Sequence, residues 1–180
     1  MNYLEPFNDI RTFIFDVDGV IAKSGAYVLD NGRLLRKTNT RDGFAIRAAV
    51  NSGYRIVVIS QGRCEGIKLR LQNMGVTDIY IATQNKMEAY EELIHLYDLD
   101  PATILYMGDD LPDYEVMCKV GLPVCPQDAA PEIKEIARYI SPLGGGEGCV
   151  RDVIEKVLKL HGNWRDSMVK TSTWTEETHW

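Results

Sequence analysis

The chain has 180 residues, of which 45% are hydrophobic and 26% are charged, and its formal net charge is −6. This balance is typical of a globular domain with its own core, and the negative charge argues against nucleic acid or an anionic membrane as a partner. No apolar run reaches the roughly 18 residues that a membrane span needs, and the N-terminus has no apolar signal segment, so we expect a cytoplasmic protein. The cysteines are widely spaced and are expected to be reduced, mostly buried thiols.

Short apolar runs alternate along the chain with segments of helical periodicity. The runs, which are typical of buried strands, are Thr12–Phe15, Ile56–Ile59, Ile79–Ala82, Thr103–Met107 and Val120–Val124. The helical segments are Asp42–Asn51, Cys64–Met74, Lys86–Tyr97, Asp113–Lys119 and Val150–Leu160. Repeated strand–helix units of this kind predict a doubly wound, mostly parallel α/β sheet in a single domain over residues 8–162.

One segment interrupts the alternation. Residues 21–39 have no helical period and contain Asp30-Asn31-Gly32, a sequence that favours a tight turn. We therefore expect an inserted β-hairpin with strands at Ala26–Leu29 and Arg33–Lys37. Residues 163–180 are polar and aromatic without periodicity, and we expect them to form a loosely ordered tail.

Polar side chains follow four of the predicted strands, at the edge where a doubly wound sheet binds its ligands. The first strand ends in Asp16-Val17-Asp18-Gly19 and the second ends in Ser60. Lys86 follows the third strand, and the fourth ends in Gly108-Asp109-Asp110-Leu111-Pro112-Asp113. The sequence therefore predicts that carboxylates, a hydroxyl and an amine meet at one edge of one sheet.

These residue types together can carry out phosphoryl transfer. Asp16 can attack phosphorus to form an aspartyl-phosphate, while Asp18 can protonate the leaving alcohol and later deprotonate the hydrolytic water. Asp16, the carbonyl group of Asp18 and Asp109 offer the oxygen ligands that Mg²⁺ prefers. Ser60 and Lys86 can hold the phosphoryl oxygens. Taken singly, the first motif could be a turn, Ser60 a helix N-cap and Lys86 a solvated helix residue.

The four segments resemble, in order, the four motifs of the haloacid dehalogenase superfamily of phosphatases. The resemblance covers roughly residues 10–160 and implies a Rossmann-like fold, Mg²⁺ dependence and an aspartyl-phosphate intermediate. Most members cover the active site with a cap domain, inserted shortly after the first motif or between the second and third. The intervals Val20–Ile59 and Ser60–Lys86 are too short for one, so we expect no cap domain.

A capless enzyme with a hairpin after its first motif is similar to the 3-deoxy-D-manno-octulosonate (KDO) 8-phosphate phosphatases. Further matching segments are Gln84-Asn85-Lys86, Lys119-Val120-Gly121-Leu122, and Gly145-Gly146-Glu147-Gly148 with Arg151. The resemblance implies a sugar acid phosphate substrate and a homotetramer, in which hairpins assemble centrally and the glycine-rich C-terminal segment closes a neighbouring site. The chain departs from the group at Ile21–Gly25 and at Ser60-Gln61-Gly62-Arg63, where the group has Thr-Asp-Gly and Thr-Gly-Arg.

Contacts with such a substrate are expected around the motifs. Arg63 and Arg70 could bind its carboxylate through a bidentate fork, or could be solvated helix residues. Thr40 could contact sugar hydroxyls, or belong to a loop and helix N-cap. The candidate substrate-binding residues are Gly19, Thr40, Gln61, Gly62, Arg63, Arg70, Asp110 and Asp113.

Three alternatives stay open at this point. The substrate could be KDN 9-phosphate or N-acylneuraminate 9-phosphate, which are nine-carbon sugar acid phosphates. The chain could also be a non-catalytic scaffold or regulatory subunit, although no nucleophile, acid or metal residue is lost. A phosphotransferase is disfavoured because such enzymes usually need a cap to exclude water from the intermediate.

Overall fold

A computed structural model describes residues 4–164 of the chain. Six strands form the central sheet, in the order β5–β4–β1–β6–β7–β8. They are β1 (Thr12–Phe15), β4 (Arg55–Ile59), β5 (Asp78–Tyr80), β6 (Ile104–Met107), β7 (Leu122–Cys125) and β8 (Tyr139–Ile140). Every neighbouring pair in this sheet is parallel. The doubly wound α/β sheet predicted from the alternating pattern is confirmed.

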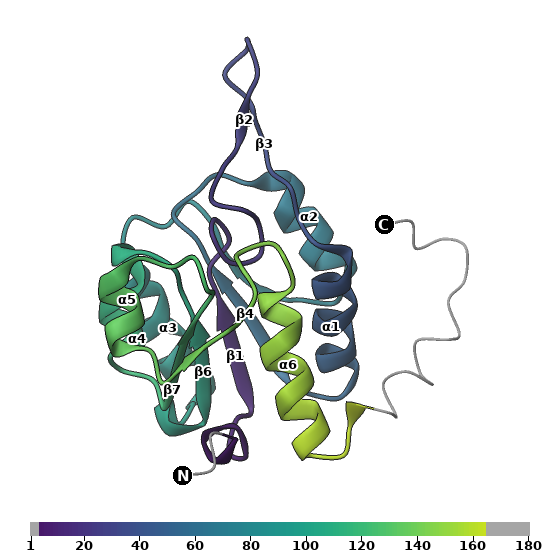
Figure 1. Cartoon of the computed structure of the whole chain (residues 1–180), viewed down its shortest axis with the longest axis vertical. Helices are drawn as coiled ribbons and strands as arrows, with labels where there is room; N and C mark the ends of the chain where they lie inside the picture. Colours follow the sequence, from purple (N-terminus) through teal and green to yellow (C-terminus); the bar gives the residue numbers. More distant parts are fainter. Residues whose placement is uncertain (1–3, 165–180) are drawn as a thin grey trace, which may run out of the picture.

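Helices cover both faces of the sheet (Figure 1). One layer contains α1 (Thr40–Asn51), α2 (Glu65–Asn73) and α6 (Cys149–Leu160), and the other contains α3 (Lys86–Tyr97), α4 (Tyr114–Met117) and α5 (Pro131–Ile136). Side chains alternate across each strand, so Phe13 and Phe15 of β1 join the first layer while Ile14 joins the second. Because both faces are covered, every residue of β1 is buried, which explains its continuous apolar sequence.

The differences from the predicted elements lie at caps and in short elements. The helix α1 begins at Thr40, two residues earlier than predicted, because the Asn39 side chain accepts a hydrogen bond from the backbone of Arg41. The predicted helix Asp113–Lys119 is a 3₁₀ turn, η3 (Leu111–Asp113), followed by the four-residue α4. The elements α5 and β8 were not predicted, because six and two residues are too few to establish a period.

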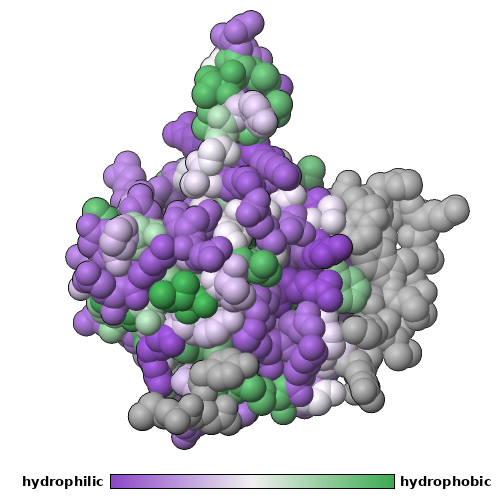
Figure 2. Space-filling view, in the orientation of Figure 1, coloured by the Kyte–Doolittle hydropathy of each residue, from purple (hydrophilic) through white to green (hydrophobic). Residues whose placement is uncertain are grey.

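A hairpin projects from the body of the molecule, as predicted (Figure 1). It consists of β2 (Tyr27–Val28) and β3 (Leu34–Leu35), which pair antiparallel across a turn with Gly32 at a φ of +78°. Hydrophobic residues gather on it (Figure 2), and the side chains of Tyr27 and Val28 are 76% and 72% exposed. Between β1 and α3 the chain forms only this hairpin, α1, β4, α2 and β5, so it has no cap domain.

The packed body extends beyond the predicted limits of 8 and 162 at both ends. Phe7, in the 3₁₀ helix η1 (Glu5–Phe7), is fully buried and lies edge to face with Tyr139 at 5.3 Å between ring centroids. Trp164 lies edge to face with Phe44 at 6.0 Å. The rest of the predicted tail, 165–180, lies outside the described residues.

The four cysteines are all free thiols, and Cys118, unlike the other three, is exposed. Within residues 4–164, the helices are all too short or too polar to cross a bilayer.

Candidate active site

Three adjacent strands deliver the predicted catalytic residues to one edge of the sheet. Asp16 follows β1, Ser60 follows β4, and Asp109 follows β6, while Lys86 is the first residue of α3. Because β1 lies between β4 and β6, these side chains surround the end of β1. They line a pocket of about 250 Å³. Its other lining residues are Asp18, Ser24, Gln61, Gly62, Asp110, Pro112 and Asp113.

Lys86 joins two carboxylates at the floor of the pocket. Its Nζ atom lies 2.8 Å from Oδ2 of Asp16 and 2.6 Å from Oδ1 of Asp113. The other carboxylate oxygen of Asp16 accepts a hydrogen bond from the backbone N–H of Val17 at 2.6 Å. Burial lowers the pKa of Lys86, but attraction to the two carboxylates outweighs it and raises the pKa overall. Lys86 is therefore a charged, fixed ammonium group beside Asp16, not a solvated helix residue.

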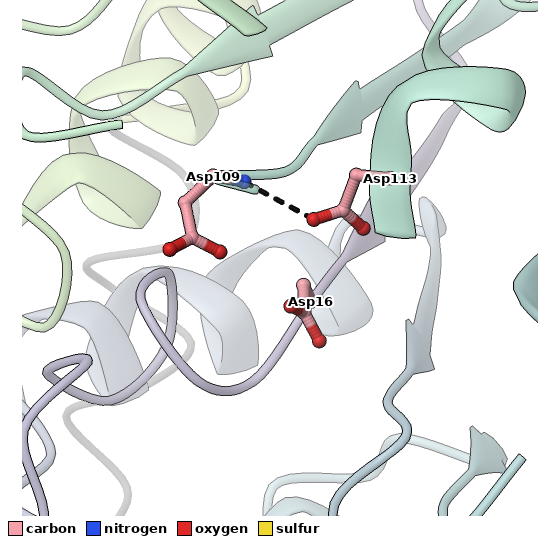
Figure 3. Close-up of side chains that lie close together, drawn as sticks. All are labelled: Asp16, Asp109 and Asp113. Carbon is pink, nitrogen blue, oxygen red and sulfur yellow. Dashed lines mark hydrogen bonds between the residues drawn. The ribbon is translucent and has the colours of Figure 1, made fainter. Parts of the chain in front are cut away.

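Asp113 contacts both Lys86 and the loop after β6. It is fully buried, and its Oδ1 also accepts a hydrogen bond from the Tyr106 hydroxyl at 2.6 Å. Its Oδ2 accepts from the backbone N–H of Asp109 at 3.2 Å (Figure 3). Since protein groups engage both oxygens and the residue is buried at the edge of the pocket, direct substrate contact by Asp113, as predicted from the sequence, does not fit. Its position is that of an anchor for Lys86 and for the loop after β6.

Three carboxylates converge at the carboxyl end of β1 (Figure 3). Asp16, Asp109 and Asp113 each offer one oxygen, and these atoms lie within 4.8 Å of one another. Burial and the neighbouring carboxylates raise the pKa of Asp16 to about 7 and that of Asp109 to about 8. One lysine therefore does not balance the negative charge here. A cluster of oxygen donors with excess negative charge fits a hard divalent cation such as Mg²⁺.

The carboxylate of Asp18 has a different partner. It forms a bidentate ion pair with Arg36, from Nε to Oδ1 at 2.6 Å and from Nη2 to Oδ2 at 3.1 Å. Arg36 was not among the predicted site residues. Nothing in its sequence spacing ties an arginine at the base of a hairpin to Asp18.

Two glycines make the close approaches in the site possible. A Cβ atom at Gly19 would lie closer than 3.0 Å to the Asp109 carboxylate, and Gly19 has a φ of +85°. A Cβ atom at Gly62 would lie 2.8 Å from Oδ2 of Asp18. In the Ser60-Gln61-Gly62-Arg63 segment, the glycine at position 62 therefore leaves space for the carboxylate of Asp18. Ser60 is buried and accepts from the Gly62 N–H at 3.2 Å, and α2 begins beyond it, so Ser60 is not its N-cap.

The glycine-rich segment 144–148 contacts the loop after Asp16 in its own chain. The N–H of Gly146 donates to the Val20 carbonyl group at 2.8 Å. A Cβ atom at Gly145 would lie closer than 3.0 Å to the Gly19 carbonyl oxygen. Glu147 forms an ion pair with Lys23. The segment therefore supports the loop that carries Asp18 and Gly19 within one subunit.

Only some of the remaining predicted substrate-binding residues line the pocket. Gln61 and Asp110 line the pocket, whereas Arg63, Arg70 and Thr40 do not. Arg70 lies on α2 against Gly43 of α1, and its Nη2 atom is buried without a hydrogen bond. Thr40 lines a separate groove beside α6. In the described part of the chain, Lys86 is thus the single cationic side chain lining the pocket.

Known proteins are similar to this chain in sequence and in fold. A family model described as haloacid dehalogenase-like hydrolase matches residues 61–148. The chain is 36% identical over 154 residues to 3-deoxy-D-manno-octulosonate 8-phosphate phosphatase KdsC of Escherichia coli strain K12, covering 86% of this chain and 82% of that protein. The crystal structure of 3-deoxy-D-manno-octulosonate 8-phosphate phosphatase from Yersinia pestis is similar to this structure, with a TM-score of 0.86 and 33% sequence identity. The match covers 91% of this chain and 88% of the Yersinia pestis chain.

A structure of the same-named enzyme from Moraxella catarrhalis, in complex with magnesium ion, phosphate ion and KDO, shares the fold with a TM-score of 0.87. It is 24% identical, and the match covers 95% of this chain and 98% of that one. The identity to the Escherichia coli enzyme over most of both chains, together with the four motifs at one sheet edge, shows that this chain is a phosphatase of the haloacid dehalogenase-like hydrolase family.

Proposed function

We propose that the protein hydrolyses KDO 8-phosphate to KDO and phosphate through an aspartyl-phosphate intermediate on Asp16. The observation that carries the reaction type is the buried Asp16 beside Lys86, next to Asp109 and facing a pocket that Asp18 also lines. The substrate rests on the relatives, since KDO 8-phosphate phosphatases match most of this chain at 36% identity. The absence of a cap between β1 and α3 leaves the pocket accessible to a sugar phosphate.

The mechanism follows from the positions of two carboxylates. A carboxylate oxygen of Asp16 forms a bond to phosphorus while the ester P–O bond breaks, and the leaving sugar oxygen takes the proton of the Asp18 carboxyl group, which enters this step protonated. Water then gives a proton to Asp18 and attacks phosphorus, which breaks the bond to Asp16 and releases phosphate. Lys86 and Ser60 hold the phosphoryl oxygens at the sheet edge. The second step regenerates both carboxyl groups.

We propose Mg²⁺ as the cofactor, held by Asp16, Asp109 and the carbonyl group of Asp18. The convergent oxygens of Asp16 and Asp109 support this, as does Gly19, which lets the backbone after Asp18 approach Asp109. Bound Mg²⁺ would screen the repulsion between the anionic nucleophile and the phosphoryl group.

The test is phosphate release from a panel of sugar phosphates, with Mg²⁺ or with EDTA. We expect the highest kcat/KM for KDO 8-phosphate, and loss of activity in EDTA that Mg²⁺ restores. A preference for KDN 9-phosphate or N-acylneuraminate 9-phosphate would keep the mechanism and change the substrate. No release from any phosphomonoester would leave the chain as a non-catalytic member of its family.

Metal binding is expected to depend on pH. The folded-state pKa values of Asp16 and Asp109, about 7 and about 8, lie above the ordinary aspartate value of 3.8. The metal-free fold therefore binds protons more tightly than the unfolded chain. The stability this contributes is fully present below about pH 4 and is lost as the pH rises through about 7 to 8. Mg²⁺ must displace these protons, so it binds more weakly as the pH falls.

We thus expect the metal-free Tm to fall between about pH 6 and pH 9, and the increase in Tm caused by Mg²⁺ to grow over that interval. Thermal unfolding at fixed Mg²⁺ concentration across this pH range measures both. Asp98→Asn, at the far end of α3, is the control and should not alter the trend. A Mg²⁺ effect that is equal at both pH limits would contradict the proposed ligands.

We also propose that the protein is a homotetramer assembled through its hairpins. The exposed Tyr27 and Val28 support this, because an apolar surface on a projecting element is typical of an interaction site. Among residues 4–164, the pocket lining offers a sugar acid's carboxylate no cation besides Lys86, which is consistent with completion by another subunit. As the resemblance implies, the neighbour's contribution would include its glycine-rich C-terminal segment.

Replacing Tyr27 and Val28 with serine and threonine is expected to lower the assembled mass towards that of one chain, because it removes apolar surface from the contact. Light scattering after size-exclusion chromatography measures the mass, and far-UV circular dichroism checks the fold. Leu96→Ser is the matched control, since Leu96 is 62% exposed on α3. If the double variant keeps the wild-type mass, the hairpin is not the assembly contact.

A further inference from the structure

Arg36 connects the projecting hairpin to the carboxylate of Asp18. Its guanidinium group makes two hydrogen bonds to Asp18, at 2.6 and 3.1 Å. The Arg36 side chain is only 10% exposed, although the preceding hairpin residues Leu34 and Leu35 are 46% and 50% exposed. The hairpin therefore places one partly buried cation beside Asp18, while the apolar side chains of Leu34 and Leu35 are exposed.

Several independent contacts build this connection. Gly62 leaves space for it, since a Cβ atom there would lie 2.8 Å from Oδ2 of Asp18 and 3.2 Å from Nη2 of Arg36. The base of the hairpin is fastened to the loop after Asp18 by the bond from the Lys23 N–H to the Lys37 carbonyl group, at 3.2 Å. The backbone hydrogen bond fixes the chain beside Arg36, and the absence of a side chain at Gly62 leaves room for the guanidinium group.

We propose that Arg36 is a positioning residue, which holds the Asp18 carboxylate in the orientation from which it exchanges protons with the reacting oxygen. The inference rests on the proposed function. A bidentate pair fixes direction as well as distance, because both N–H groups must align with both oxygens. The Asp18 side chain is 39% exposed and lines the pocket, so without this pair it would sample other rotamers.

The role predicts a dependence on the leaving group. When the ester bond of a sugar phosphate breaks, the alcohol oxygen needs a proton from Asp18. When p-nitrophenyl phosphate reacts, p-nitrophenolate leaves with the electron pair and needs no proton. Since kcat/KM reports the steps up to formation of the aspartyl-phosphate, a misplaced Asp18 should slow the first substrate and spare the second.

The experiment compares Arg36→Met with Arg138→Met, a change at an exposed arginine outside both the hairpin and the pocket. We expect Arg36→Met to lower kcat/KM at least about 10-fold for KDO 8-phosphate and for an alkyl phosphate without a carboxylate, but less than about 3-fold for p-nitrophenyl phosphate. Arg138→Met should match the wild type throughout. Arg36→Lys should recover part of the loss, and Arg36→Met should cost nothing further in an Asp18→Asn background.

Three results would overturn the inference while leaving the phosphatase activity intact. Equal losses on all substrates, with a lower Tm, would mean a structural role. A loss confined to substrates with a carboxylate, seen in KM, would mean that Arg36 binds the substrate. Wild-type values for Arg36→Met would mean that the ion pair has no role. A wild-type protein that hydrolyses none of the substrates would instead overturn the proposed function, and this inference with it.

Discussion

Replacing Asp16 with asparagine is expected to lower kcat/KM by about 10⁴-fold or more on every phosphomonoester, including p-nitrophenyl phosphate. The amide oxygen is a poor nucleophile, so no aspartyl-phosphate forms whatever the leaving group. This uniform loss separates the nucleophile from Asp18 and Arg36, whose replacement should spare substrates with good leaving groups. Steady-state kinetics on the substrates used for Arg36 measures the difference.

The fold of this variant is expected to persist. Asparagine keeps an oxygen at the end of β1 and removes one negative charge from a cluster in which burial and repulsion already raise the pKa of Asp16. Lys86 keeps its ion pair with the buried Asp113. The metal-free Tm should therefore not fall, while Mg²⁺ should raise it less than in the wild type. Asp98→Asn controls for the substitution itself, and substantial activity in Asp16→Asn would refute the mechanism.

Replacing Gly145 with alanine is expected to cost about 1–3 kcal/mol of stability and to reduce activity about 100-fold. The new methyl group would lie closer than 3.0 Å to the backbone carbonyl group of Gly19, which cannot move aside as a flexible side chain can. The loop from Asp18 to Lys23 must shift, and with it the carboxylate of Asp18. Shifts near 1 Å at a catalytic group are enough for losses of this size.

The adjacent glycine provides the matched control. A Cβ atom at Gly144 would lie 3.1 Å from Oδ2 of Asp128 and 3.2 Å from Oε2 of Glu147, and these side-chain ends need to move by only a few tenths of an ångström to make room. Gly144→Ala should therefore keep the activity and change the stability little. Chemical denaturation and kcat/KM for both variants test the contrast. Equal effects of the two changes would show that the segment does not position the loop after Asp16.

The sequence by itself determined the sheet, the catalytic edge and the absence of a cap. Continuous apolar runs such as Thr12–Phe15 are buried on both faces, so their composition alone identifies them as central strands. Carboxyl ends of parallel strands meet at one edge, so the sequence predicts that Asp16, Ser60 and Asp109 lie close together. The elements α5 and β8 were not predicted, because they are too short to show a periodic pattern of hydrophobic residues.

Only the tertiary structure decided which partners these side chains have. Arg36 and Asp18 are 18 residues apart, and their pairing depends on how the hairpin folds back over Gly62. Asp113 fits the fourth motif by spacing, yet its burial beneath Lys86 makes it an anchor and not a substrate contact. The glycine-rich segment reaches Gly19 of its own chain, across more than a hundred residues. Such contacts depend on packing in three dimensions, and local sequence patterns record only the near neighbours of each residue.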